Sequence, residues 1–242
     1  MKINDLIKII GWELINPFVL KRKRNKIYDF PSTLSGINIG CGIHNPSNWL
    51  GVDGGFTHYL IHKIPKGMYK LFFSGQKMVT NYTFDEYYKL SKSIQLVHHE
   101  LKYGLPFKDN SIPNIYSSHF LEHLFRADAK KLLEQCYRVL ARGGTMRICV
   151  PSIEYEIDCM QEAIEKYKTK NSDDIQQFIT SDTVGFNSVY SDHRYMYDYK
   201  RLSEVLNDIG FINLRECKYR EGDLPDVAII DTREGLIIEC SK

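Results

Sequence analysis

The stretch INIGCGIHNPSNWLGVDGG (residues 37–55) contains two short apolar runs, and each ends in residues suited to a ligand-binding turn. Gly40 and Gly42 follow the first run, and Asp53 ends the second. Glycine lets the backbone turn sharply and approach a bound molecule closely, because no Cβ is in the way. The pattern predicts two β-strands whose carboxyl ends carry a glycine turn and an acidic side chain.

Two kinds of ligand can be compared for this turn. A dinucleotide site has the pattern G-x-G-x-x-G at the start of a long helix, with an acidic residue about 20 positions later. Here Asn45 stands at the third glycine position, Asp53 comes too early, and residues 43–48 leave room for about one helical turn. A ribose without pyrophosphate suits the segment better, since the Asp53 carboxylate can accept hydrogen bonds from both ribose hydroxyls. The alternative is a plain glycine turn followed by an exposed aspartate.

The rest of the chain alternates between strand-like and helical patterns. After the runs at 36–40 and 49–53, further strands are expected at 94–100, 114–118, 145–150, 211–217 and 235–240. The clearest helix is DAKKLLEQCYRVLARGG (128–144), with Asp128 expected as the N-cap and Gly143–Gly144 as the stop. A second helix is expected at 199–210, again ending at a glycine. This alternation predicts an α/β fold with a doubly wound, mostly parallel sheet.

Residues 1–35 are expected to form an N-terminal helical segment, and 36–242 a single domain. Insertions at about 54–93 and 152–190 leave from strand ends, where doubly wound sheets bind ligands, so we expect both to cap the pocket. The N-terminal segment ends in the basic run KRKRNK (21–26), which fits either contact with a membrane surface or a solvated turn after a packed helix. The second alternative is favoured, because the apolar residues are not confined to one stripe.

Composition narrows the functional class. A net charge of +2 gives no general reason to expect a nucleic-acid partner. The six cysteines are scattered without a C-x-x-C pair, so they are expected as small core residues in a reducing compartment. No apolar run approaches the roughly 20 residues of a membrane span, and the N-terminus is a poor signal peptide because Lys8 and Glu13 interrupt its apolar stretch. A cytoplasmic location is therefore expected.

Several motifs follow one another in a characteristic order. After the glycine turn and G-V-D (51–53) come Glu100, L-P-F (105–107), D-N-S (109–111), L-E-H (121–123), and R-V-L (138–140) with Gly143–Gly144. This order resembles the class I S-adenosylmethionine-dependent methyltransferase family. The resemblance is strong over about 36–151 and looser over 190–240. It looks closest to small predicted bacterial methyltransferases in which a short N-P-x-x-W segment joins the first strands.

The resemblance implies a Rossmann-like, seven-stranded sheet and S-adenosylmethionine as cofactor. Glu100 would accept a hydrogen bond from the adenine amino group, and His44 replaces the usual last glycine of the loop. The cofactor-binding residues expected on this basis are Gly40, Cys41, Gly42, His44, Asp53, Glu100, Leu101, Ser117 and His119. His119 and His193 are the candidate catalytic bases, although each is equally well interpreted as a hydrogen-bonded structural histidine.

The sequence also supports expectations about metal binding and about the methyl acceptor. His119 and His123 have the i, i+4 spacing of a metal pair, as do His58 and His62, but no third ligand is evident, so no metal is expected. The expected activity is methyl transfer to a small-molecule acceptor, with a sugar or glycolipid suggested by the family's frequent association with bacterial surface-glycan biosynthesis. The alternatives are a non-catalytic S-adenosylmethionine-binding protein and a nicotinamide-dependent oxidoreductase. The oligomeric state stays open.

Overall fold

A computed structural model describes residues 14–73, 82–154, 157–158, 161 and 193–242. Seven strands form one sheet in the order β3-β2-β1-β4-β5-β7-β6. The strands are β1 (Gly36–Ile39), β2 (Trp49–Asp53), β3 (Gln95–His98), β4 (Ile112–Ser118), β5 (Leu140–Val150), β6 (Ile212–Glu216) and β7 (Leu236–Ser241). Only β7 runs antiparallel to its neighbours, β5 and β6. The predicted doubly wound, mostly parallel sheet is therefore confirmed.

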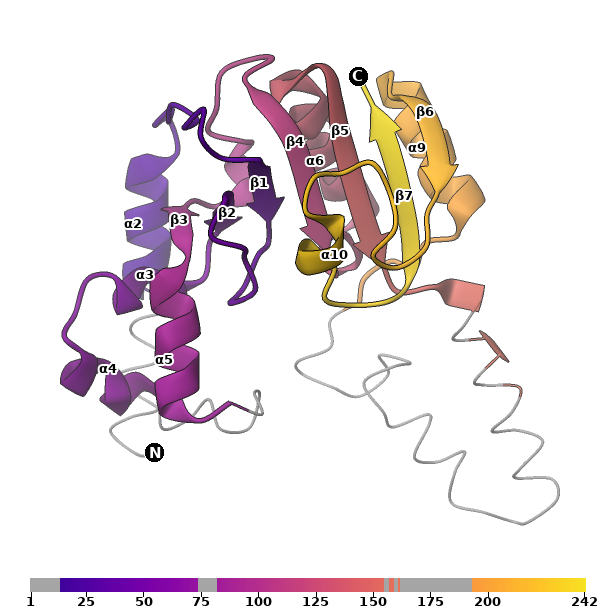
Figure 1. Ribbon diagram of the computed structural model, residues 1–242. Helices are drawn as coiled ribbons and strands as arrows, with labels where there is room; N and C mark the ends of the chain where they lie inside the picture. Colours follow the sequence, from indigo (N-terminus) through magenta and orange to yellow (C-terminus); the bar gives the residue numbers. More distant parts are fainter. Residues whose placement is uncertain (1–13, 74–81, 155–156, 159–160, 162–192) are drawn as a thin grey trace, which may run out of the picture.

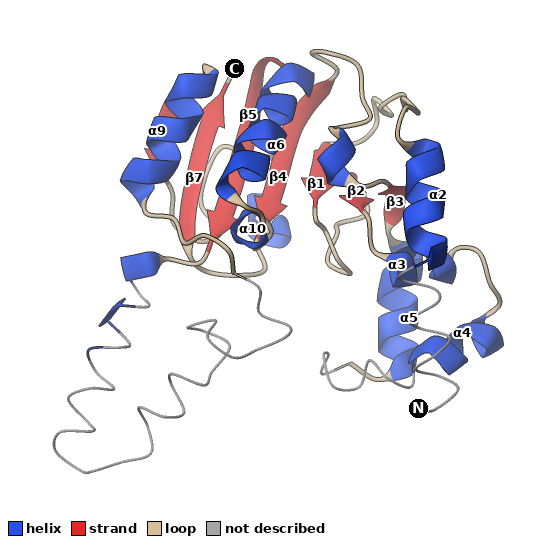
Figure 2. Ribbon diagram, turned by 180° about the vertical axis from the view of Figure 1, so that it is seen from behind, coloured by secondary structure: helices blue, strands red, loops and turns tan. Residues whose placement is uncertain are grey.

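Two long helices cover one face of the sheet. They are α6 (Arg126–Val139) and α9 (Tyr199–Ile209), both in front of the sheet in Figure 2. The main apolar core lies between these helices and the strands, and it includes Ile37, Ile115 and Ile148. The expected limits of α9 are confirmed. Asp198 caps its first turn by accepting a hydrogen bond from the backbone N–H of Arg201, and Gly210 ends it in the left-handed conformation.

The predicted limits of α6 are wrong at both ends. The helix begins at Arg126, so Asp128 lies within the first turn and is not the N-cap. It ends at Val139, before Gly143–Gly144. The reason is that Leu140 is already extended, fully buried and paired with Ile112, so both glycines belong to β5. Tertiary pairing here overrides the glycine stop signal.

The β1–β2 connection contains turns and no helical turn. The Asn45 side-chain amide donates to the carbonyl of Trp49 at 2.6 Å, and the Trp49 N–H donates to the carbonyl of Pro46. These local bonds satisfy the backbone without a helix, so the face of the sheet opposite α6 and α9 has no covering helix from this connection.

The insertion at 54–93 forms three short helices: α3 (Phe56–Ile61), α4 (Lys66–Phe73) and α5 (Phe84–Ser93). They lie beyond the carboxyl ends of β1–β3 in Figure 1, around a small core of Ile61, Tyr69 and Tyr87. Most of the expected insertion at 152–190 lies outside the described residues.

At the N-terminal end, α2 (Asn16–Lys23) buries Asn16 and Leu20, and residues 1–13 lie outside the described part. No helix in the described part of the chain is long and apolar enough to cross a membrane.

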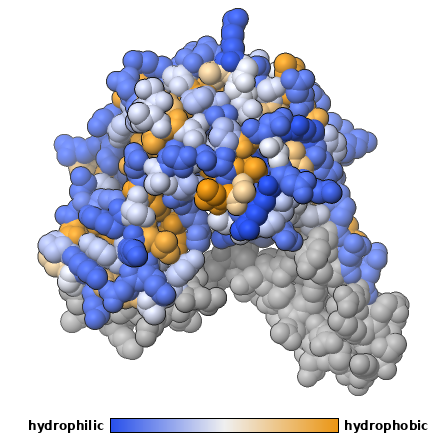
Figure 3. Space-filling view, viewed as in Figure 1, coloured by the Kyte–Doolittle hydropathy of each residue, from blue (hydrophilic) through white to orange (hydrophobic). Residues whose placement is uncertain are grey.

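The connection between β6 and β7 crosses the face of the sheet opposite α6 and α9. It includes α10 (Val227–Ile230), which lies in front of the sheet in Figure 1 and behind it in Figure 2. Leu224 and Ile230 pack against Trp49 and Tyr116 to form a second core. The Asp226 carboxylate also accepts hydrogen bonds from three side chains, those of Ser35, Asn48 and Trp49. This connection therefore covers the area that the β1–β2 connection leaves open. Hydrophilic side chains surround an apolar patch near the middle of this face in Figure 3, and Ile229 of α10 is 67% exposed.

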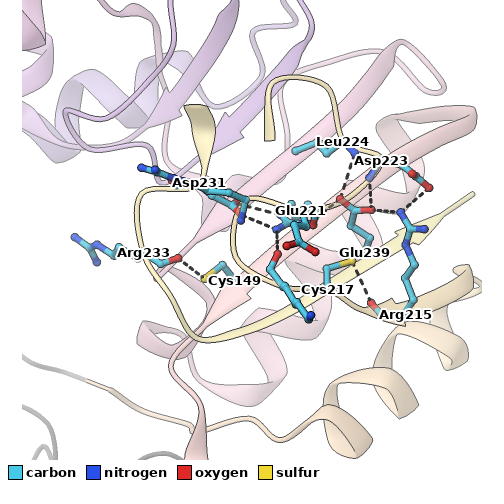
Figure 4. Close-up of polar contacts among 12 residues, drawn as sticks. Cys149, Arg215, Cys217, Glu221, Asp223, Leu224, Asp231, Arg233 and Glu239 are labelled. Carbon is cyan, nitrogen blue, oxygen red and sulfur yellow. Dashed lines mark hydrogen bonds and ion pairs between the residues drawn. The ribbon is translucent and has the colours of Figure 1, made fainter. Parts of the chain in front are cut away.

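A buried charge network fastens this connection to the sheet (Figure 4). Arg147, on β5, is fully buried, and its Nη1 donates to Glu239 Oε1 at 2.8 Å while its Nε donates to Asp231 Oδ1 at 3.1 Å. Its remaining N–H groups donate to the other carboxylate oxygen of Asp231, Oδ2, and to the carbonyls of Glu221 and Lys218. Burial alone would raise the pKa of Glu239, but hydrogen bonds from Arg215, two backbone N–H groups and Arg147 outweigh it and lower the pKa.

Candidate functional site

Two cavities open at the carboxyl ends of the central strands, and Gly40 lines both. The smaller one, of about 390 Å³, lies at the ends of β1, β2 and β3. The larger one, of about 570 Å³, lies over the residues that follow β1 and β4. Ligands of open α/β sheets bind at this edge, so the two cavities together are the candidate site.

The smaller cavity contains the two acidic side chains expected from the sequence. Asp53 lies at the end of β2 and Glu100 follows β3, while Leu20 and Phe120 contribute apolar walls. The Asp53 carboxylate accepts hydrogen bonds from the N–H groups of Gly42 (3.1 Å) and Gly55 (2.6 Å). A carboxylate offers about four lone-pair sites, so acceptor capacity remains for two ligand hydroxyls. Two acceptors between apolar walls fit a nucleoside.

The glycine turn brings the backbone to the boundary between the cavities. Gly40 and Gly42 have φ values of +66° and +52°, which a side chain makes unfavourable. A Cβ on Gly40 would come within 2.5 Å of the Phe120 ring, whereas a Cβ on Gly42 would meet nothing within 4 Å. The Cys41 thiol lies against Gly51 of β2, and burial raises its pKa, so the thiol acts as a packing group.

The larger cavity is lined by four segments distant in sequence. His44 comes from the β1–β2 connection, Tyr82 from the 54–93 insertion, His119 from the end of β4, and Thr232 and Arg233 from the β6–β7 connection. Burial lowers the pKa of His44, so this imidazole is neutral at pH 7. Arg233 is the one Lys or Arg among the described lining residues. The cavity therefore combines several hydrogen-bonding groups and one cationic side chain with a mainly apolar wall that includes Ile43 and Ile230.

A histidine cluster stands beside this cavity around Glu122. The Nδ1 of His119 lies 3.6 Å from Glu122 Oε1, and the Nε2 atoms of His123 and His193 each lie 3.9 Å from it. Burial raises the pKa of Glu122 to about 7 and lowers the pKa of His119 to about 4. Burial also lowers the pKa of His193. The two candidate bases from the sequence thus share one carboxylate.

Of the remaining predicted residues, some line one of the two cavities and others do not. Leu101 lines the smaller cavity beside Glu100. Ser117 lies on the α6 side of β4 and lines neither main cavity, whereas the next residue, Ser118, lines the larger one. His58 lines the larger cavity. Neither His58 nor His62 belongs to a metal-binding group among the described residues.

Sequence inspection did not single out Thr232 and Arg233. The available signal was the length of the β6–β7 connection, which far exceeds the two to five residues of a hairpin loop between adjacent antiparallel strands. The Glu122 cluster had a partial signal in the H-F-L-E-H spacing, but its third histidine is distant in sequence.

Comparisons with known proteins agree with this geometry. Residues 37–148, from β1 almost to the end of β5, match the family model described as a methyltransferase domain. No curated protein matches the chain. Solved structures that align with it include an S-adenosylmethionine-dependent methyltransferase from Archaeoglobus fulgidus, at 16% identity over 100% of both chains with a TM-score of 0.44. Another is phosphoethanolamine N-methyltransferase 2 from Haemonchus contortus with S-adenosylmethionine, at 13% identity over 96% of this chain and 53% of that one, TM-score 0.45.

Residues 37–148, which carry the glycine turn and the acidic strand end and make up a little under half of the chain, match a methyltransferase domain. The matched region is thus a methyltransferase domain, and the cofactor expected for it from the sequence motifs is S-adenosylmethionine. The residues present fit that cofactor, because the smaller cavity offers unused acceptor capacity on Asp53 and a second carboxylate, Glu100, beside apolar walls.

Proposed function

We propose that this methyltransferase methylates an oxygen atom of a small, hydroxyl-rich acceptor, such as a sugar or the headgroup of a glycolipid. The observation that carries the proposal is the lining of the larger cavity, where His44, Tyr82, Ser118, Thr232 and Arg233 all offer hydrogen-bonding groups. An apolar acceptor would leave such groups without partners at a cost of about 1–3 kcal/mol each. A compact polyol would satisfy several of them together.

Cofactor and acceptor share the two cavities in this proposal. Asp53 and Glu100 bind the adenosine part in the smaller cavity, and the methionine part of the ligand passes Gly40, which lines both cavities. When bound, S-adenosylmethionine would supply a methyl group on a sulfonium, and the neutral thioether would be the leaving group as the acceptor oxygen takes the methyl group. The protein therefore contributes mainly alignment of the acceptor oxygen with that methyl group.

Arg233 and the histidine cluster have different roles toward the acceptor. The Arg233 guanidinium would bind an anionic group, such as a phosphate on the acceptor, since it can donate two parallel hydrogen bonds. A hydroxyl acceptor also loses a proton during transfer. The cluster of His119, Glu122, His123 and His193 lies beside the larger cavity, and we assign proton removal to this place.

The test is a transfer assay with radiolabelled S-adenosylmethionine and three acceptor panels: sugars and sugar phosphates, glycolipids, and amines or apolar phenols. We expect transfer to hydroxyls of the first or second panel, with the KM raised in Arg233→Met for anionic acceptors only. Transfer confined to the amines or phenols would contradict the acceptor class. Binding of S-adenosylmethionine without turnover on any panel would instead indicate a non-catalytic binding protein.

A further inference from the structure

Four side chains with metal-ligand chemistry converge on one oxygen atom. Around Glu122 Oε1 lie His119 Nδ1 at 3.6 Å and the Nε2 atoms of His123 and His193, each at 3.9 Å. The ligand atoms of Glu122, His123 and His193 all lie within 4.8 Å of one another. The cluster draws on the end of β4 and on the segment before α9, so it depends on tertiary structure.

The carboxylate at the centre lacks the partners that a buried charge requires. The Glu122 side chain is 1% exposed, and neither carboxylate oxygen has a hydrogen-bond partner among the described residues. In that part of the chain, only histidines lie within ion-pair distance of it. A buried carboxylate without compensation is costly, and buried charges in proteins are usually paired or bound to metal ions. A bound cation or a proton on the carboxylate would therefore compensate the buried charge of Glu122.

The hydrogen bond of His119 decides which of its nitrogen atoms is available. Its Nε2 lies 3.1 Å from the carbonyl oxygen of Glu234, and this contact requires the proton to be on Nε2. Nδ1 then carries a lone pair that faces Glu122 Oε1. A ring N–H that donates to a backbone carbonyl while the other nitrogen binds the ion is the usual arrangement of a metal-bound histidine.

The backbone holds the cluster in place. The N–H groups of Arg194 and Tyr195 donate to the carbonyl oxygen of Glu122, at 2.7 and 3.2 Å, and so fix the position of the preceding residue, His193. His119 adopts a φ of +48°, an uncommon conformation for a residue with a side chain. Such strain persists where surrounding contacts hold it, and it is concentrated at functional sites.

We propose that His119, Glu122, His123 and His193 bind a divalent transition-metal ion. Three imidazoles and one carboxylate are typical ligands of Zn²⁺. Ligand atoms in a tetrahedral zinc site are about 3.3 Å apart, given Zn–N distances of about 2.0–2.1 Å. Glu122 Oε1 lies 3.6–3.9 Å from the three histidine nitrogen atoms, and the ligand atoms of Glu122, His123 and His193 lie within 4.8 Å of one another. Metal binding therefore requires these side chains to move closer together by up to about 1.5 Å, and His119, which is outside that group, to move further toward the other two imidazoles.

The site has an open side that an oxygen ligand can reach. The side chains of His123 and His193 are 38% and 20% exposed, and His119 lines the larger cavity. Zinc sites can expand to five ligands, and the ion lowers the pKa of a bound water or hydroxyl strongly. A hydroxyl of the acceptor bound there would release its proton to solvent more readily. This catalytic role rests on the proposed function, whereas metal binding itself does not.

The test measures metal binding without acceptor or methyl transfer. The full chain is stripped with a chelator and titrated with Zn²⁺ by calorimetry and with Co²⁺ by visible absorption. We expect one ion per chain with micromolar or tighter affinity, and a Co²⁺ spectrum of a four- or five-coordinate site. Glu122→Gln and His193→Ala should each weaken binding about 100-fold, and Zn²⁺ should raise the Tm of the wild type more than that of either variant.

The matched control is His62→Ala, which removes a partly buried histidine outside the cluster and should leave metal affinity unchanged. Circular dichroism establishes that each variant is folded. No bound ion in the wild type, or equal affinity in the wild type and folded Glu122→Gln, would overturn the metal site. If Zn²⁺ binds as expected but methyl transfer to hydroxyls is absent, the proposed function fails and the metal site stands.

Discussion

Arg147 and Asp231 form a fully buried ion pair that joins β5 to the segment preceding β7. Thr232 and Arg233 come directly after Asp231 and line the larger cavity. The pair therefore positions one wall of the proposed acceptor site. A buried ion pair often contributes little net stability compared with apolar residues, but removing one partner leaves a buried charge uncompensated.

Replacing Asp231 with Asn should lower the free energy of unfolding by about 3 kcal/mol, because Arg147 would keep only Glu239 as a charged partner among the described residues. Urea titration of the purified variant measures this change. Asp223→Asn is the control, since Asp223 is 75% exposed and pairs with Arg215 on the surface. That substitution should cost less than about 1 kcal/mol. Equal effects of the two substitutions would contradict the assigned role of the buried pair.

The two glycines of the cofactor loop should respond differently to alanine. Both have positive φ, so each substitution costs about 1–2 kcal/mol of backbone strain. Gly40→Ala also places a methyl group within 2.5 Å of the Phe120 ring, at the boundary of the cavities, whereas Gly42→Ala meets open space. We expect Gly40→Ala to be the less stable variant and to bind S-adenosylmethionine much more weakly. Unfolding titrations and calorimetry test the order, and the reverse order would be inconsistent with the structure.

Asp53→Ala should weaken S-adenosylmethionine binding by about 10- to 150-fold. This range corresponds to the loss of about 1.5–3 kcal/mol for hydrogen bonds to a charged group. The measurement is calorimetric titration of the cofactor and of its demethylated product. Asp29→Ala provides the control, because Asp29 is 88% exposed and pairs only with Lys108 among the described residues. Unchanged affinity in Asp53→Ala would contradict the proposal that Asp53 binds the ribose hydroxyls of the cofactor.

His98 predicts a defined pH dependence of stability. Burial, followed by the positive charge of Lys23, lowers the pKa of His98 to about 4 from 6.5. The Nδ1 of the ring lies 3.3 Å from Lys23 Nζ, so the neutral ring accepts a hydrogen bond from the ammonium group there. Because the folded pKa is depressed, the unfolded chain binds the extra proton first. This contribution to stability is complete above pH 6.5 and is lost as the pH falls toward 4.

His98→Gln tests this linkage. The slope of the unfolding free energy against pH between 6.5 and 4 should decrease by up to about 1.4 kcal/mol per pH unit, the value for one proton. Urea titrations at several pH values give the slope for the variant and for the wild type. Parallel slopes would mean that His98 titrates alike in the folded and unfolded chains.

Local patterns were sufficient for most of the sheet. β1 and β2 are short, buried runs, each followed by a turn, and they lie within one residue of their expected limits. The limits of α6 were not predictable, because the pairing of Leu140 with Ile112 decides where the helix ends. Glycine signals are local, whereas this pairing joins residues on separate strands.

The sequence by itself determined most of the strand-forming segments, the glycine turn, and the two acidic side chains of the smaller cavity, because each depends on residues close together in the chain. Only the tertiary structure decided how Arg233 reaches the larger cavity and how His193 meets Glu122. The first depends on a buried charge pair between Arg147 and Asp231, and the second on backbone hydrogen bonds from the residues after His193. Contacts between distant segments follow from packing of the whole domain, and no local pattern of apolar and polar residues encodes them.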